Sequence, residues 1–158
     1  ALHRFPAKMA KWAIMAAQRV ERQYGGDAGR IWNDTPRACD LQNRFDEFDG
    51  ISQKKASMAA NILVRDRKIP VSDRRGIDVS YDVQIRRVFL RTGLVAEDTE
   101  EAIIGIAREL NPDYPGALDL AAWYIGRSHC RPRDPHCHEC PLDELCPKAG
   151  QRETVLAE

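Results

Sequence analysis

The chain has 158 residues, of which 43% are hydrophobic and 30% charged, and its formal net charge at pH 7 is zero. That length fits one domain or two small ones. The balanced charge excludes a globally basic nucleic-acid binder but allows a local basic patch. The sequence contains no run of about 18 apolar residues, so it predicts no membrane span. An odd number of cysteines, with no secretory signal pattern, indicates a reducing intracellular compartment rather than a disulfide framework.

Helical periodicity recurs along the chain and no stretch alternates with a period of two, so the sequence predicts an all-α protein. The first predicted helix, 6–24, ends at a Gly-Gly pair. Apolar residues recur along it at steps of three and four, and their stripe requires a covering partner: Met9, Trp12, Ala13, Ala16, Val20 and Tyr24.

The middle of the chain predicts a helical hairpin over 36–65. A short helical turn is expected at 27–32, after which Thr35 and Pro36 suit the cap and first position of a helix. A glycine turn at 49–52 then leads to a second helix, 53–65, with Ser52 as its cap. Such a hairpin presents backbone N–H groups at a helix N-terminus, where a phosphate oxygen can bind. An ordinary αα-hairpin explains this stretch equally well.

A polar connector, 68–78, marks a domain boundary. We therefore expect a first domain over 1–77, a helical second domain over 78–150 and a frayed tail over 151–158. In the second domain the sequence predicts three helices, 82–92, 99–110 and 116–128, and the last of them leads directly into Cys130.

Four of the five cysteines fall within seventeen residues, at the spacing C-x6-C-x2-C-x5-C: Cys130, Cys137, Cys140 and Cys146. Thiolates gathered this tightly usually hold a metal or an iron–sulfur cluster. Structural zinc favours two close pairs, and the bacterial ferredoxin spacing also differs from this one. A single [4Fe–4S] cluster wrapped by one short loop fits the pattern best. Three histidines offer alternative ligands that four available cysteines make unnecessary: His129, His136 and His138.

Two arginines, Arg131 and Arg133, lie in the six-residue gap that follows Cys130. Held on a short tethered loop, they would form a small cationic surface in a neutral protein, and phosphate is its natural partner. Incidental surface arginines are the alternative.

Three motifs in this order resemble the endonuclease III branch of the helix-hairpin-helix DNA glycosylases. The cysteine spacing resembles the iron–sulfur loop of that branch. The stretch 48–56 (F-D-G-I-S-Q-K-K-A) lies where the family has its hairpin, and 82–88 (D-V-Q-I-R-R-V) resembles the segment that carries its catalytic aspartate. The resemblance extends from about Pro6 to Cys146.

The resemblance implies a base-excision-repair glycosylase with AP-lyase activity. Its substrate would be double-stranded DNA that contains either a damaged base, most simply an oxidised pyrimidine, or an abasic site. The enzyme would be located in the cytoplasm or nucleoid. By match to the family motifs, Lys54 is the Schiff-base lysine, Asp82 the essential aspartate, and the four cysteines the ligands of a [4Fe–4S] cluster. Lys55 and Asp78 are the next candidates for these two catalytic roles.

The resemblance also implies DNA contacts from the hairpin and the cysteine loop, together with a monovalent cation at the hairpin. The implied contact residues are Gly50, Ile51, Ser52, Gln53, Arg131 and Arg133.

The chain departs from the family in three respects. Ser52 replaces the second glycine of the hairpin, and the gap between Lys54 and Asp82 is longer. Helices that precede 6–24 in the family have no counterpart here, so an upstream segment or a partner chain is expected to supply them. Two other functions stay open: a monofunctional or mismatch glycosylase, against which Lys54 argues, and a non-catalytic DNA-binding or redox-sensing iron–sulfur protein.

Overall fold

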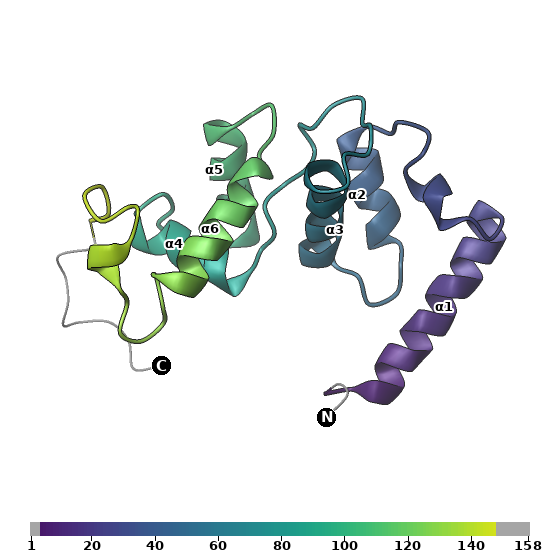
Figure 1. The fold of residues 1–158 in the computed structure, drawn as a ribbon, viewed down its shortest axis with the longest axis horizontal. Coiled ribbons are helices and arrows are strands. Elements are labelled where there is room, and N and C mark those ends of the chain that lie inside the picture. The colour runs from purple at the N-terminus through teal and green to yellow at the C-terminus, as the bar shows by residue number, and fades with distance from the viewer. Residues whose placement is uncertain (1–3, 148–158) are drawn as a thin grey trace. The chain divides into compact units, whose positions relative to one another are not determined.

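The computed structural model describes residues 4–147 and divides the chain into two compact units, 1–77 and 78–158. The described residues form six α-helices and two short 3₁₀ helices, with no strand among them (Figure 1). The predicted all-α class is therefore confirmed. Among the described helices, none combines the length and apolar character required to cross a bilayer. The predicted tail, 151–158, lies outside the described residues.

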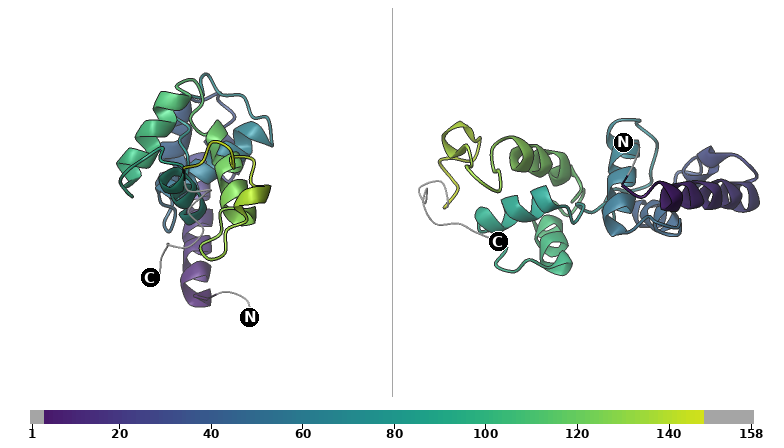
Figure 2. Two further views of the ribbon diagram at one scale, coloured as in Figure 1. Left: turned by 90° about the vertical axis from the view of Figure 1, so that its left-hand side faces the viewer. Right: turned by 90° about the horizontal axis from the view of Figure 1, so that it is seen from below.

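Helix α1 (Pro6–Tyr24) has the predicted bounds and ends at Gly25, whose positive φ of 62° suits a residue without a side chain. None of its residues is buried. Phe5, Met9 and Ile14 expose 54%, 39% and 59% of their surface. Figures 1 and 2 show α1, in purple, without a second described helix of its own unit lying along it. Within the first unit the apolar stripe is therefore only partly covered: Met9 is exposed, and Trp12, Ala16, Val20 and Tyr24 are half-buried.

Helices α2 (Ala38–Asp46) and α3 (Gln53–Arg65) pack against each other and form the core of the first unit. Their facing side chains recur at helical spacing, and each is at least 92% buried: Ala38, Leu41 and Phe45 from α2, and Ala56, Ala60 and Val64 from α3. The short helix η1 (Ala28–Ile31) connects α1 to this pair, and the Asp27 carboxylate caps it by accepting from the Gly29 N–H at 2.8 Å.

The predicted start of α2 at Thr35 and Pro36 was wrong. The helix begins at Ala38, and Arg37 is its N-cap residue. The Pro36 carbonyl instead accepts a hydrogen bond from the N–H of Ser72, at 3.0 Å, so it is bonded to the connector. Ser52 does cap α3 by position, but its side chain makes no capping hydrogen bond.

The second unit packs α4 (Val83–Arg91), α5 (Glu100–Leu110) and α6 (Ala117–Ser128) around one apolar core. Polar caps set the helix starts: Asp82 caps α4 and Thr99 caps α5. The core side chains are Val79, Ile85, Val88, Phe89, Ile103, Ala107 and Ala122. Helices α4 and α6 are the main packed pair, and the cysteine segment follows α6.

Close contact between α4 and α6 depends on the absence of a side chain at Gly126, where an added Cβ would lie 2.7 Å from the carbonyl oxygen of Gln84. We predict that Gly126→Ala lowers the free energy of unfolding by about 1–3 kcal/mol, because the two helices must separate to admit the methyl group. Gly105→Ala is the control. It meets nothing within 4 Å in the middle of α5, and it is expected to stabilise by up to about 1 kcal/mol. Urea unfolding measures both, and equal effects would contradict the packing argument.

Candidate functional site

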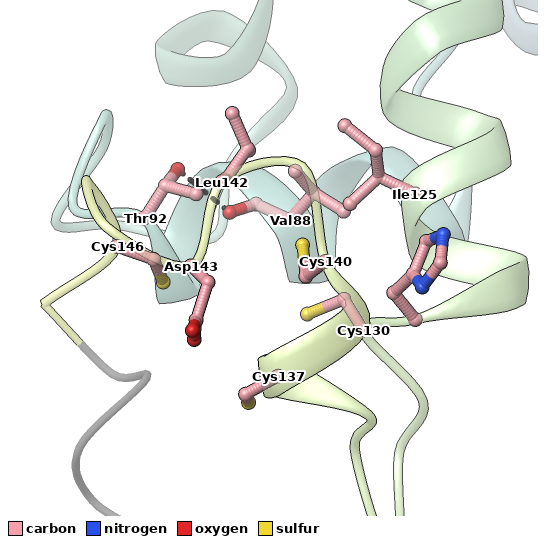
Figure 3. A pocket seen from close by; sticks show the side chains of 10 residues that line it. Val88, Thr92, Ile125, Cys130, Cys137, Cys140, Leu142, Asp143 and Cys146 are labelled. Atoms are coloured by element: carbon pink, nitrogen blue, oxygen red, sulfur yellow. Dashed lines mark hydrogen bonds between the residues drawn. The ribbon is translucent and has the colours of Figure 1, made fainter.

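The four clustered cysteines line one pocket of the second unit (Figure 3). Cys130 follows the end of α6, Cys137 opens the short helix η2 (Cys137–Glu139), and Cys140 and Cys146 come from the segment after it. Val88, Ile125 and Leu142 form the apolar side of the pocket. All five cysteines of the chain are free thiols and partly buried.

The electrostatics of this pocket suit a positively charged occupant. Burial raises the pKa of the Cys137 thiol, and the neighbouring Cys130 and Cys146 thiols raise it further. Burial likewise raises the pKa of the Cys140 thiol. Iron or zinc binds the thiolate, so the positive charge of a metal would offset both the burial and the mutual repulsion of the four sulfurs.

A single ion and a cluster make different demands on four thiols. A single zinc requires four ligand atoms about 2.0–2.3 Å from one point. Within residues 4–147, no group of three or more His, Cys, Asp or Glu side chains is placed to hold a metal ion. Four thiols around a shared pocket fit a cluster, in which each thiolate binds a different metal atom. The donor set therefore fits a four-thiolate iron–sulfur cluster.

Two arginines of α4 tie the cysteine loop to that helix. Arg91 donates to the carbonyl oxygens of Arg131 (2.6 Å) and Pro132 (3.1 Å), and its Nη1 lies 3.7 Å from the Sγ of Cys130. Arg87 donates to the carbonyl oxygens of Cys130 (2.5 Å) and Gly126 (2.7 Å). Burial lowers the pKa of Arg87, but a guanidinium stays charged at neutral pH. Both contacts are therefore charge-assisted.

The side chains of Arg131 and Arg133 are exposed, as expected for the cationic surface. The guanidinium of Arg131 lies 3.4 Å from the Nε2 of His136. Asp134, next to Arg133, adds a negative charge that the sequence-based prediction did not weigh. The loop that holds both arginines is fixed through its backbone by Arg91, so their side chains remain available.

In the first unit, Lys54 and Lys55 lie in the first turn of α3 but have different surroundings. Lys54 is half-buried, whereas Lys55 is exposed and its Nζ donates to the carbonyl oxygen of Gly50 at 2.5 Å. The same ammonium lies 5.4 Å from the centre of the Trp12 ring. Lys55 is thus already bonded to the turn, which disfavours it as the reactive lysine.

The predicted hairpin contacts lie on a tight turn. Gly50 has a φ of 80°, and the Trp12 indole packs so closely on it that a Cβ at Gly50 would lie 2.3 Å from the ring. The Ile51 N–H donates to the Phe48 carbonyl at 2.9 Å and closes the turn. Gln53 uses its side-chain amide to donate to the Ser57 hydroxyl at 3.0 Å. The monovalent cation stays a prediction, with the Lys55 ammonium now found at one hairpin carbonyl.

Asp82 is 93% buried at the N-terminus of α4, and its Oδ1 accepts from the Gln84 N–H at 2.8 Å. Asp78, the alternative carboxylate, forms a two-point ion pair with Arg108 at 2.8 Å for each bond. A third buried carboxylate, Asp119, accepts from the backbone and hydroxyl of Ser80. Asp78 and Asp119 therefore have structural partners that account for their burial. Asp82 lies in the second unit and Lys54 in the first.

The sequence-based prediction missed Trp12, Arg87 and Arg91. Trp12 was assigned to the apolar stripe of the first helix, and the two arginines were given no role. The signal that the sequence offered was the spacing of the two arginines, which lie four residues apart on one helix. It does not reveal that the acceptors are carbonyls some forty residues later.

No protein-family model matches the chain. Adenine DNA glycosylase from Homo sapiens is 33% identical over 85 residues, a match that covers 48% of this chain and 15% of that protein. A trapped endonuclease III–DNA covalent intermediate superposes with a TM-score of 0.69 at 17% identity, over 93% of this chain and 61% of that one. A non-covalent endonuclease III–DNA complex gives 0.61 at 19% identity, over 85% and 55%.

The chain thus spans 15% of the curated relative and less than two thirds of either solved chain. At these identities the solved structures establish the fold. The chain resembles the helix-hairpin-helix DNA glycosylase superfamily and has the all-helical fold of its endonuclease III branch.

Proposed function

We propose that this chain carries the catalytic residues of a base-excision-repair DNA glycosylase with AP-lyase activity. The observation that carries the proposal is the position of Lys54, in the first turn of a helix that follows a glycine turn, in a chain with the endonuclease III fold. The substrate would be duplex DNA that contains an oxidised pyrimidine or an abasic site. Free, clustered thiols suit a reducing compartment that also holds the chromosome.

In the proposed reaction the target nucleotide is flipped out of the duplex. The neutral amine of Lys54 attacks C1′ of the sugar, and the bond to the base breaks, with the electron pair leaving on the base. The sugar ring opens to an imine on Lys54. Loss of the C2′ proton then expels the 3′ phosphate by β-elimination, and hydrolysis of the imine returns the free lysine.

Asp82 would stabilise the positive charge that develops on the sugar and assist proton transfer. Its carboxylate is fixed by the N-terminus of α4, through the bond from the Gln84 N–H. That bond fixes the orientation of the carboxylate. The partnered carboxylates of Asp78 and Asp119 serve the fold instead.

Two surfaces would bind the DNA backbone. The turn at Gly50–Gln53 presents the N-terminus of α3, where backbone N–H groups and the helix dipole favour a phosphate. The exposed guanidiniums of Arg131 and Arg133 would bind a second phosphate. Such contacts position the duplex and carry no information about the lesion.

We propose a [4Fe–4S] cluster held by Cys130, Cys137, Cys140 and Cys146. When bound, such a cluster supplies a compact rigid core and a centre able to exchange one electron. The first of these roles is enough to support the proposed DNA contact, because it fixes the loop that carries Arg131 and Arg133. The two units would correspond to part of the glycosylase barrel with its hairpin and to the cluster domain.

The incompletely covered surface of α1 points to a missing partner. Three large apolar side chains remain exposed on or beside it, while Trp12, Met15 and Val20 are only half-buried. We propose that a helical segment, from upstream in the same protein or from a partner chain, packs on this face. A solved chain of the same fold has 39% of its length beyond the part that matches this one, which leaves material for such helices.

A non-catalytic DNA-binding or redox-sensing iron–sulfur protein is the second candidate, because the cysteine pocket alone would suit it. A monofunctional or mismatch glycosylase is the third, and similarity to an adenine DNA glycosylase favours it. Neither the second nor the third candidate forms a covalent bond between Lys54 and the DNA. Trapping such a bond therefore distinguishes the first proposal from the other two.

Borohydride reduction tests the Schiff base. With the complete assembly from cells and duplex DNA that has one abasic site, we expect a covalent adduct, and Lys54→Ala should lower its yield by about 10²-fold or more because the nucleophile is lost. Lys55→Ala, the matched control in the same turn, should retain it. Absence of an adduct from the wild-type assembly would refute the lyase proposal.

Metal analysis tests the cluster. After anaerobic purification we expect four irons and four sulfides per chain and no stoichiometric zinc. Cys137→Ser should lose the iron, because one of four ligands is removed, and Cys39→Ser should keep it, because Cys39 lies outside the pocket. One zinc per chain in place of iron would contradict the assignment.

Hydrogen exchange tests the missing partner. In the isolated chain, the α1 amides should exchange much faster than those of α3, because no residue of α1 is buried, whereas five residues of α3 are. In the longer protein or complex, α1 should gain protection while α3 changes little. Equal protection of α1 and α3 in the isolated chain would show that no further segment is needed.

A further inference from the structure

One ring nitrogen of the partly buried His129 has no explanation within the fold. Its Nδ1 atom is inaccessible to solvent and has no hydrogen-bond partner among the described residues. Leaving such a group unpaired costs about 1–3 kcal/mol, so native structures almost always provide a partner. His129 also lines the pocket formed by the four cysteines.

The position of the ring is fixed from several sides. The His129 N–H donates to the Ile125 carbonyl at 2.9 Å, and its own carbonyl accepts from the N–H groups of Arg131 (2.8 Å) and His136 (2.9 Å). The Tyr124 ring contacts the imidazole edge-on, with the ring centres 6.1 Å apart. A backbone bonded on both sides and a packed ring leave Nδ1 little freedom to find another acceptor.

A trapped water is a poor partner for Nδ1. The pocket could admit a water molecule. However, a buried water needs two to four polar partners, and the pocket offers weakly bonding thiols, three aliphatic side chains, a Thr92 hydroxyl already bonded to backbone carbonyls, and the Asp143 carboxylate. Sulfur atoms of an anionic cluster are stronger acceptors for an N–H than thiols are.

We infer that His129 donates its Nδ1–H to a sulfur of the cluster bound by the four cysteines, and thereby raises the reduction potential of that cluster. The inference rests on the [4Fe–4S] cluster proposed above. Hydrogen bonds to cluster sulfurs stabilise the more negatively charged, reduced form. Arg91, whose Nη1 lies 3.7 Å from the Cys130 sulfur, would act in the same direction at the adjoining ligand.

Two variants at position 129 and one control variant at position 138 test the inference in the holoprotein. His129→Leu keeps the bulk but removes the donor, and it should lower the midpoint potential of the cluster. His129→Asn places an amide N–H near the former Nδ1 and should restore most of the difference. His138→Leu is the matched control, because His138 lies in the same loop with 65% of its side chain exposed, and it should leave the potential unchanged. Equal potentials in all four proteins would overturn the inference.

A spectroscopic measurement covers the case in which His129→Leu fails to bind the cluster. In the wild-type protein labelled with ¹⁵N-histidine, pulsed EPR of the paramagnetic cluster should detect a nitrogen coupling that His138→Leu retains. Absence of this coupling would refute the contact, including the case of an intervening water. A chain that binds no iron would instead refute the cofactor itself, and metal analysis identifies that outcome first.

Discussion

Two guanidiniums on α4 hold the second unit in its functional form. Arg87 and Arg91 lie one turn apart, and together they bond to the carbonyl oxygens of four residues at the end of α6 and in the cysteine loop. These acceptors belong to a helix end and an irregular loop, where carbonyls have no helical partner. Without the two arginines, the loop would lose its attachment to the core at the point where Cys130 enters the pocket.

This attachment gives α4 two functions at opposite ends. Its N-terminus fixes the carboxylate of Asp82, and its last turn fixes the backbone that carries Arg131. The apolar side of the helix packs in the core through Ile85, Val88 and Phe89. One short rigid element thus sets the distance between the proposed charge-stabilising group and a proposed phosphate contact, and a helix is better suited to this than a loop.

Much of this architecture can be predicted from short stretches of sequence, whereas the remainder depends on contacts between distant residues. The bounds of α1 and α3 follow from apolar spacing and glycine stops, and the capping role of Asp82 from its place before an apolar run. The start of α2 was mispredicted because Pro36 bonds to Ser72, a residue far along the chain. The ion pair of Asp78 with Arg108 and the carbonyl contacts of Arg87 and Arg91 are likewise tertiary. Residue type alone does not reveal them, since an arginine on a helix is most often solvated. The unpaired nitrogen of His129 becomes visible only when its surroundings are known.

The packing of Trp12 on Gly50 has a consequence for sequence variation. The Trp12 indole lies on the Cα of Gly50 and leaves no space for a side chain there. The bare backbone of Gly50 supplies the flat surface on which the indole packs. Position 12 therefore tolerates a large aromatic only while position 50 remains glycine. The ammonium groups of Lys8 and Lys55 lie 4.7 and 5.4 Å from the centre of the Trp12 ring, so these two contacts also depend on the indole. Across related sequences these four positions should change together, even though 47 residues separate the first from the last.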